Sequence, residues 1–320
     1  MILIIADIND VHADTVGEKL ISRGVEPLRL NVDISSLRNT GLHFDGTHWV
    51  ILQNGQRIDS SIVSSVWCRR TNVSSSIEEE MSIKSEDRLW RAEWNRSLFG
   101  FYNSLRNVYW LNKIGDAALA DNKYFQTYIA ARHGLQTPNY ITSNIKENLI
   151  EFSKKSPDVA LKFMSQDIYK SDDGTVLGLY VNKIRTEHLL DFGDINENPV
   201  VLQTYIEKKY EVRYTVIHDH HLLCKIESQQ SDRARVDWRR YDICNTPHLA
   251  IDPPPHIRTS VSNFMSDLNL NYGALDFIVD PQDKWWLLEV NSSGQWLWIE
   301  DLVGLQISDK IADALVFNSK

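Results

Sequence analysis

The sequence predicts a mixed α/β (α+β) fold with more than one domain. A chain of 320 residues is long enough for a large core and for several domains. Its composition, 42% hydrophobic and 24% charged, is that of a globular enzyme rather than a disordered or fibrous chain. Apolar strand-like runs alternate with amphipathic helical stretches in the first third, and the rest of the chain contains many further strands.

The first unit, residues 1–112, opens with a short apolar run that reaches Asp7 without a preceding basic segment, which predicts a buried strand and not a signal peptide. Asn54-Gly55 between two apolar runs is a strong hairpin signal. The predicted strands are Met1–Ala6, Glu26–Asn31, Thr47–Leu52, Gln56–Ile58 and Ser64–Cys68. The predicted helices are Asp14–Arg23, which ends at Gly24, and Glu78–Arg106.

The remaining two-thirds of the chain combines helices with many strands. The predicted helices are Asp116–His133, Ile145–Lys155 with Asn144 as its cap, His256–Leu268 and Ile307–Phe317. The predicted strands are Val159–Met164, Thr175–Ile184, Val200–Ile206, Glu211–His218, His221–Gln229, Tyr272–Asp280 and Lys284–Asn291.

Charge and cysteine content exclude several classes of protein. With 34 Lys and Arg against 43 Asp and Glu, the net charge of −9 argues against a dedicated nucleic-acid binder. No apolar run of about 18 residues is present, so no membrane span is expected. The three cysteines, Cys68, Cys224 and Cys244, lack CxxC spacing, which argues against a disulfide framework or zinc site. We therefore expect a reduced, cytoplasmic location.

The last predicted hairpin carries the most informative polar residues. A loop of Pro281–Lys284 would place Asp276 directly opposite Glu289, with Trp285 and Asn291 on the same face as Glu289. Facing carboxylates repel, and a cation between them would remove that penalty. Carboxylate and amide oxygens suit Mg²⁺. The alternative is a solvent-facing strand that happens to carry two acids.

Three cations are further candidates. Lys162 lies in an apolar strand-like run, where it either extends to solvent or contacts a phosphate. Lys123 heads an amphipathic helix and could equally be solvated. Arg213 shares a strand face with Glu211, either as a simple ion pair or to hold a ribose and a phosphate. P-loop, GxGxxG, HExxH and GxSxG motifs are absent, and the histidines at 218, 220 and 221 are interpreted as a polar turn.

Taken in order, these residues resemble the ATP-grasp ligases. The elements that carry the resemblance are Lys123, Lys162, the hinge-like strand Gln203-Thr204-Tyr205-Ile206, Glu211-x-Arg213, Asp276 and Glu289-x-Asn291. A narrower resemblance, over nearly the whole chain, is to the microviridin-type peptide ligases, or graspetide synthetases. It rests on the first strand and helix, Val66–Arg70, Leu111–Lys113, Thr142–Asn144, Val236–Arg239 and Glu289–Trp296. The loop Ser165–Gly178 departs from many ATP-grasp enzymes, because Gly174 and Gly178 are its only glycines.

The resemblance implies an ATP-grasp fold behind an N-terminal pre-ATP-grasp domain. Its expected divisions are residues 1–112, a central ATP-grasp subdomain with the lid at 113–199, and a C-terminal subdomain with the metal site at 200–320. It implies ATP and Mg²⁺ as cofactors, with phosphates held by Lys123 and Lys162, adenine by Gln203, Tyr205 and Ile206, ribose by Glu211, and metal by Asp276, Glu289 and Asn291. Arg213 and Arg239 would stabilise the transferred phosphoryl group, and Asp237 is a weak candidate for the general base.

In that family the enzyme joins Asp or Glu side chains of a ribosomally made precursor peptide to Ser, Thr or Lys, forming macrocyclic esters or amides. The expected partner is therefore a precursor peptide with a leader segment. Arg69 and Arg70 follow a predicted strand and either hold an acidic side chain of the peptide or lie in a solvated turn. Trp296 follows the predicted metal motif and is expected to line the substrate channel. The sequence does not determine the oligomeric state, and a homodimer is one possibility. Two alternatives are an ATP-grasp ligase that adds a free amino acid to a protein or small acceptor, and a nucleotide-binding regulatory protein with a silent site.

Overall fold

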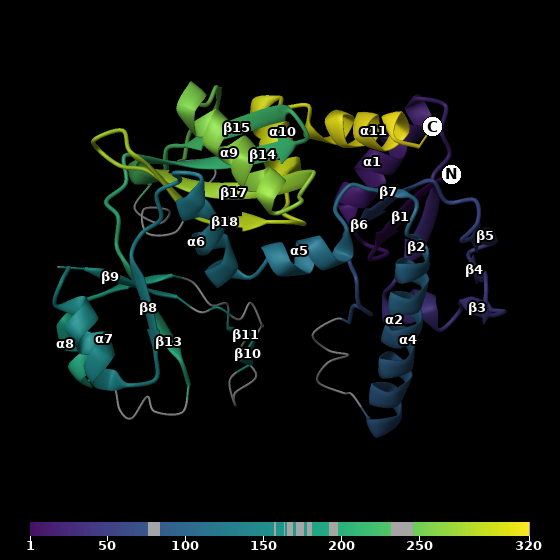
Figure 1. The fold of residues 1–320 in the computed structure, drawn as a ribbon, viewed down its shortest axis with the longest axis horizontal. Coiled ribbons are helices and arrows are strands. Elements are labelled where there is room, and N and C mark those ends of the chain that lie inside the picture. Colours follow the sequence, from purple (N-terminus) through teal and green to yellow (C-terminus); the bar gives the residue numbers. More distant parts are fainter. Residues whose placement is uncertain are drawn as a thin grey trace.

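The computed structural model describes residues 1–75, 84–156, 158–162, 164, 169–170, 176–177, 181–191, 198–231 and 246–319. Within these ranges, three larger sheets and two small ones are arranged in an N-terminal, a central and a C-terminal unit (Figure 1). No helix in the described ranges has the length and apolar character needed to cross a membrane.

The N-terminal unit is built on a parallel sheet of order β2-β1-β6-β7. Its strands are β1 (Ile2–Ala6), β2 (Leu28–Asn31), β6 (Ser65–Cys68) and β7 (Tyr109–Trp110), with helices α1 (Val11–Ser22), α2 (Ile34–Leu37) and α4 (Ser85–Ser104). A separate three-stranded sheet contains β3 (Gly41–Phe44), β4 (Trp49–Gln53) and β5 (Gln56–Asp59). The predicted β4–β5 hairpin is confirmed, because Asn54 and Gly55 both adopt positive φ at its turn.

Both faces of the parallel sheet are covered, as such sheets require. Ile2 and Ile4 belong to a core shared with α1 and α11 (Ile307–Phe317), whereas Leu3 and Ile5 belong to a core shared with α4 and the small sheet. Helix α1 starts three residues before the predicted Asp14, because the Asp10 carboxylate accepts hydrogen bonds from two amides of the first turn.

The central unit is an antiparallel sheet of order β12-β9-β13-β8 with two helices against it. Its strands are β8 (Tyr140–Ser143), β9 (Val159–Lys162), β12 (Asn182–Ile184) and β13 (Val200–Thr204), and its helices are α7 (Lys146–Ser153) and α8 (Thr186–Asp191). The short strands β10 (Tyr169–Lys170) and β11 (Val176–Leu177) form a separate antiparallel pair. The predicted strand Thr175–Ile184 is therefore two pieces, with residues 178–180 outside the described ranges.

The C-terminal unit is an antiparallel sheet of order β16-β15-β14-β17-β18. Its strands are β14 (Tyr210–Ile217), β15 (His220–Ile226), β16 (His248–Ile251), β17 (Tyr272–Val279) and β18 (Trp285–Asn291), and its helices are η1 (Ser228–Gln230), α9 (Pro255–Asp267) and α10 (Leu297–Val303). Alternate residues of β14, β17 and β18 pack with α6 (Lys123–Arg132) and α9 in one core. The opposite face carries the polar residues of the candidate site.

Segments from the three expected divisions, 1–112, 113–199 and 200–320, share sheets and cores. Strand β13 lies inside the central sheet, so that sheet extends to Thr204. Ile129 and Ala130 of α6 belong to the core of the C-terminal sheet, although α6 was expected in the central unit. The terminal helix α11 packs on α1 in the N-terminal unit. Cores assembled from distant segments, rather than contiguous stretches of chain, define these units.

Two helix predictions also need correction. The single predicted helix Asp116–His133 is two helices, α5 (Ile114–Ala120) and α6, because the Asn122 side chain accepts hydrogen bonds from the Tyr124 and Phe125 amides and starts a new helix. Helix α7 begins after Ile145, whose amide donates to Ser143 Oγ at 3.0 Å, so Asn144 is not the cap residue.

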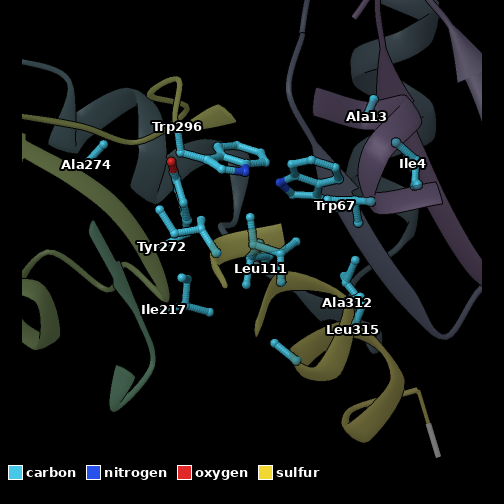
Figure 2. Packing of buried hydrophobic residues seen from close by; sticks show 14 of the residues in the cluster. Ile4, Ala13, Trp67, Leu111, Ile217, Tyr272, Ala274, Trp296, Ala312 and Leu315 are labelled. Carbon is cyan, nitrogen blue, oxygen red and sulfur yellow. The ribbon is translucent and has the colours of Figure 1, made fainter. Parts of the chain in front are cut away.

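A hydrophobic core that contains Trp67, Tyr272 and Trp296 joins the N-terminal and C-terminal units (Figure 2). Trp67 from β6 and Trp296, just before α10, have ring centroids 5.7 Å apart. Trp296 also lies 5.7 Å from the Tyr272 ring of β17, and its indole Nε1 donates to Ser308 Oγ at 3.0 Å. Its side chain is fully buried. The expectation that Trp296 lines a substrate channel is therefore wrong.

Three side chains from the segment before and within α6 cover the edge strand β18 and the residues after it. The buried Asn112 amide donates to the carbonyls of Tyr272 and Ser292 at 2.8 and 2.9 Å, and its oxygen accepts from the amides of Asn271 and Tyr272. Asp121 accepts from Ser292, and Gln126 bonds both backbone groups of Val290. These side chains replace a neighbouring strand and protect the edge.

We predict that Asn112→Ala destabilises the protein, because it removes four hydrogen bonds from backbone groups, three of them buried and one partly buried. Each buried group left without a partner costs about 1–3 kcal/mol. Urea unfolding, followed by tryptophan fluorescence, would measure the loss. Asn103→Ala is the matched control, because Asn103 is exposed and makes one local hydrogen bond to Phe99. Equal unfolding midpoints for both variants would contradict the prediction.

Candidate active site

A row of three charged side chains crosses the strands β14, β17 and β18. The register pairs Arg213 with Asp276 and Asp276 with Glu289. Arg213 Nη1 donates to both carboxylate oxygens of Asp276, at 2.9 and 3.0 Å. The prediction that Asp276 faces Glu289 is confirmed. The row therefore places two carboxylates and one guanidinium on the sheet face opposite the α6–α9 core.

The register that produces this row differs from the predicted one. At the turn, Val279 pairs with Trp285 and Phe277 with Leu287, one residue out of the predicted register. An irregularity between Asp276 and Phe277 then restores the pairing of Asp276 with Glu289. Because the extra residue reverses the alternation, Trp285 packs in the core on the opposite face from Glu289. The expectation that Trp285 and Glu289 share a face is wrong.

The repulsion between the facing carboxylates is offset by cations of the chain itself. Lys123 Nζ lies 2.7 Å from Glu289 Oε2, and the Arg213 guanidinium donates hydrogen bonds to Asp276. Burial lowers the pKa of Arg213, but the charges of Asp276, Tyr272 and Glu289 outweigh it and raise the pKa above its ordinary value. Arg213 Nε is buried and has no hydrogen-bond partner among the described residues, so the chain does not use all of its donors.

The donor set at this row fits Mg²⁺. Asp276 and Glu289 offer hard carboxylate oxygens, and the Asn291 amide lies next to them, with Nδ2 3.4 Å from Glu289 Oε1. Across the described ranges no three His, Cys, Asp or Glu side chains gather into a metal site. A metal here would thus rest on two carboxylates and one amide oxygen, and Mg²⁺ commonly completes such a set with phosphates and water.

The loop that follows β18 is held by a different donor at each of four successive carbonyls. Asn112 bonds the carbonyl of Ser292, Arg69 Nη1 that of Ser293 at 3.2 Å, the Tyr272 hydroxyl that of Gly294 at 2.7 Å, and Arg213 Nη2 that of Gln295 at 3.0 Å. The loop is therefore tied both to the charged row, through Arg213, and to the N-terminal unit, through Arg69.

Arg69 has partners other than those expected of it. Its Nε lies 2.8 Å from Asp10 Oδ2, and the two side chains are only 7% and 8% exposed. The guanidinium also lies over the Trp67 and Trp296 rings, at 5.5 and 5.1 Å. Burial raises the pKa of Asp10, but Arg69 reverses this effect and holds it below its ordinary value. The neighbouring Arg70 is exposed.

The residues predicted to bind adenine and ribose lie in β13, in the connection from the central sheet to β14, and in β14 itself. Gln203 is in β13, and Lys162 ends β9, where it pairs with Val201 of β13. The Tyr205 amide donates to the carbonyl of Asp158 at 3.3 Å, so this amide is already engaged at the proposed adenine edge. Ile206 follows, and Glu211 lies buried on β14 on the same face as Arg213.

Several expected residues lie outside the described ranges. They include Asp237 and Arg239, Cys244, and most of the loop Ser165–Gly178. Sequence reasoning in turn missed the covering side chains Asn112, Asp121 and Gln126 as structural elements, and missed Lys208. Lys208 Nζ lies 3.0 Å from Glu211 Oε1. A lysine three residues before the candidate ribose carboxylate was the available signal.

Comparisons with known proteins agree with this arrangement. The family described as the MvdD pre-ATP grasp domain matches residues 1–118. The RiPP-associated ATP-grasp ligase of Chryseobacterium gregarium, solved with ADP and a leader and core peptide, is 29% identical with a TM-score of 0.87, over 99% of this chain and 96% of that one. Comparison with curated proteins gives no match.

Two macrocyclases of Microcystis aeruginosa MRC are also similar. MdnC, solved with its precursor peptide MdnA, is 25% identical with a TM-score of 0.87, over 99% of each chain. MdnB is 28% identical with a TM-score of 0.79, also over 99% of each chain. The fold is thus an ATP-grasp fold with a pre-ATP-grasp domain. Within that class, the chain is similar over nearly its whole length to a RiPP-associated ATP-grasp ligase and to two macrocyclases.

We predict that Gly294→Ala impairs the site, because a Cβ at this position would lie 2.5 Å from Ala274 Cβ and 2.8 Å from Arg213 Nη2. Such overpacking typically costs about 1–3 kcal/mol, and here it displaces Arg213. The expected result is a lower kcat for ATP turnover together with a lower unfolding midpoint.

Gly17→Ala in α1 is the matched control, since a Cβ at position 17 meets no atom within 4 Å. That control should keep its activity and gain about 0.5–1 kcal/mol of stability from the better helix former. Normal turnover and stability of Gly294→Ala would show that the close contact at Gly294 is unimportant.

Proposed function

We propose that this chain is an ATP-dependent macrocyclase that joins Asp or Glu side chains of a ribosomally made precursor peptide to Ser, Thr or Lys of the same peptide. The observation that carries the proposal is the Arg213–Asp276–Glu289 row with Lys123, set in a fold shared over nearly its whole length with ligases solved with ADP or precursor peptides. The roles that we propose for individual residues are based on their positions in this fold.

The reaction needs an activated carboxylate, because a carboxylate is a poor electrophile. The γ-phosphoryl group of ATP is transferred to a side-chain carboxylate oxygen, which gives an acyl phosphate and ADP. The acceptor hydroxyl or amine then attacks the acyl carbon, and inorganic phosphate leaves. Such transfers depend mainly on positioning and on neutralising the phosphoryl oxygens. Arg213 is suited to this role, because its guanidinium is fixed by Asp276 and by the Gln295 carbonyl.

When bound at Asp276, Glu289 and Asn291, Mg²⁺ would neutralise negative charge on the ATP phosphates. The ammonium of Lys123 lies against Glu289, so we propose that Lys123 exchanges this carboxylate for a phosphate oxygen. Lys162, at the end of β9, would contact the phosphates from the central sheet. Gln203, the backbone at Tyr205 and Ile206, and Glu211 would bind adenine and ribose.

For the substrate we assign different tasks to the two arginines. Arg69 is enclosed by Asp10, Trp67, Trp296 and the Ser293 carbonyl, and it therefore orders the loop after β18. Arg70 is exposed and is the cation that we propose for an acidic side chain of the peptide. A leader segment docked elsewhere would raise the effective concentration of the reacting segment. We further propose a cytoplasmic location, consistent with the free thiols of Cys68 and Cys224.

We predict that Asp276→Asn and Glu289→Gln each lower kcat for ATP turnover by on the order of 10²–10³, the usual effect of losing one electrostatic contact to the transition state. ADP release in the presence of Mg²⁺ and precursor peptide would measure it. Asp283→Asn is the control, because Asp283 is an exposed acid in the turn of the same hairpin. Wild-type turnover in both site variants would refute the assignment.

Mass spectrometry tests the substrate class directly. With ATP, Mg²⁺ and a candidate precursor peptide, each ring closed should lower the peptide mass by the equivalent of one water, about 18 Da, because the carboxyl group loses an oxygen to inorganic phosphate and the acceptor loses a proton. A mass increase by an amino-acid residue would instead identify a free amino-acid ligase. An unchanged mass with ADP release driven by another acid would exclude a peptide substrate.

A further inference from the structure

We propose that Lys208 is a positioning residue for nucleotide recognition: its ammonium orients the Glu211 carboxylate toward the ribose hydroxyls and so sets the preference for ribonucleotides. The inference rests on the proposed function, since it requires that ATP binds beside Glu211. Lys208 belongs to the connection between β13 of the central sheet and β14 of the C-terminal sheet.

The contact itself is short and buried. Lys208 Nζ lies 3.0 Å from Glu211 Oε1, and each side chain is only 5% exposed. The next residue provides a sharp contrast, because Lys209 is 47% exposed and pairs with Asp283, which is 66% exposed. The two adjacent lysines therefore form ion pairs that differ in burial. The Lys208 pair is buried at the candidate nucleotide site, whereas the Lys209 pair is exposed to solvent.

A buried ion pair is poor evidence for a role in stability. Removing two charges from water costs several kcal/mol per ion, and an apolar pair of similar size often stabilises a protein equally well. The Lys208–Glu211 pair is therefore better explained by what the oriented carboxylate can bind. Glu211 lies on the face of β14 that also carries Arg213, one alternate position away from the charged row.

The connection between β13 and β14 is fixed at both ends, and this holds Lys208 in place beside Glu211. Lys183 of β12 lies over the Tyr205 ring at 4.3 Å and pairs with Asp158 and Glu207, so the start of the connection is fixed to the central sheet. The Lys209 amide donates to the Val279 carbonyl at 2.8 Å, so its end is fixed to the C-terminal sheet. Lys208 lies between these anchors, where its ammonium can hold the Glu211 carboxylate in one orientation.

The proposal is tested by comparing nucleotides with and without ribose hydroxyls. Calorimetry with Mg²⁺ present would give the affinity of the wild type for ADP, 2′-deoxy-ADP and 3′-deoxy-ADP. A hydrogen bond to a charged group predicts a preference for ADP of about 10-fold to 100-fold over at least one deoxy analogue. In Lys208→Met this ratio should fall to about threefold or less. Because a lost phosphate contact weakens all three ligands equally, the ratio isolates the ribose.

Three further variants complete the test. Lys209→Met, the matched control, should keep the wild-type ratio. Lys208→Arg, which can still pair with Glu211, should restore most of it. Glu211→Gln should lower the ratio, and Lys208→Met with Glu211→Gln should lower it no further, because residues that act through one contact are not additive. The double variant also carries no unpaired buried charge, so it provides the measurement if Lys208→Met alone does not fold.

The outcomes separate the two levels of inference. A wild-type ratio in Lys208→Met, with normal discrimination by the wild type, would overturn the role of Lys208 and leave the proposed function intact. Equal binding of ADP and both deoxy analogues by the wild type would overturn the ribose role of Glu211 and this inference with it. Failure of the wild type to bind ADP at all would overturn the proposed function itself.

Discussion

Two carboxylates held face to face on neighbouring strands are the constraint on which the rest of this site depends. Asp276 and Glu289 repel each other, and the sheet can keep them paired only if positive charge is supplied nearby. Arg213 supplies it from the next strand, and Lys123 supplies it from the first turn of α6. The same four groups are those that we propose for phosphoryl transfer, so the folded sheet already balances charges that a nucleotide and its metal would rearrange.

The site is assembled by contacts from all parts of the chain. Arg213 of β14 and Tyr272 of β17 hold the loop after β18 from the C-terminal sheet, and Asn112 and Arg69 hold it from the N-terminal side. Arg69 is itself fixed by Asp10, whose carboxylate also caps α1. A disturbance at the start of α1 therefore has a short physical route to the residues beside the charged row.

Much of this could be predicted from the sequence, and the failures have physical causes. Alternation along β14 placed Glu211 and Arg213 together, and the hairpin pattern placed Asp276 opposite Glu289. The pairing of Asp276 with Glu289 was predicted correctly, but the predicted register at the turn was wrong by one residue. An irregularity between Asp276 and Phe277 compensates for this shift. No local sequence pattern predicts this irregularity. Trp296 was misplaced because its burial depends on Trp67 and Tyr272, which lie far away in the sequence. The position of β13 likewise depends on pairing with β8 and β9.

The packing of α11 on the N-terminal unit has a consequence for how the protein folds during synthesis. Ile307, Ile311 and Leu315 cover the same face of the first sheet that Ile2 and Ile4 present. Lys19 of α1 and Arg23, the residue after α1, pair with Asp309 of α11. The first strands leave the ribosome long before residues 307–317. Until α11 has been made, one face of the N-terminal sheet remains partly exposed to solvent. Nascent chains with exposed apolar surface are prone to aggregate. The N-terminal sheet is thus made well before residues 307–317, which complete its core.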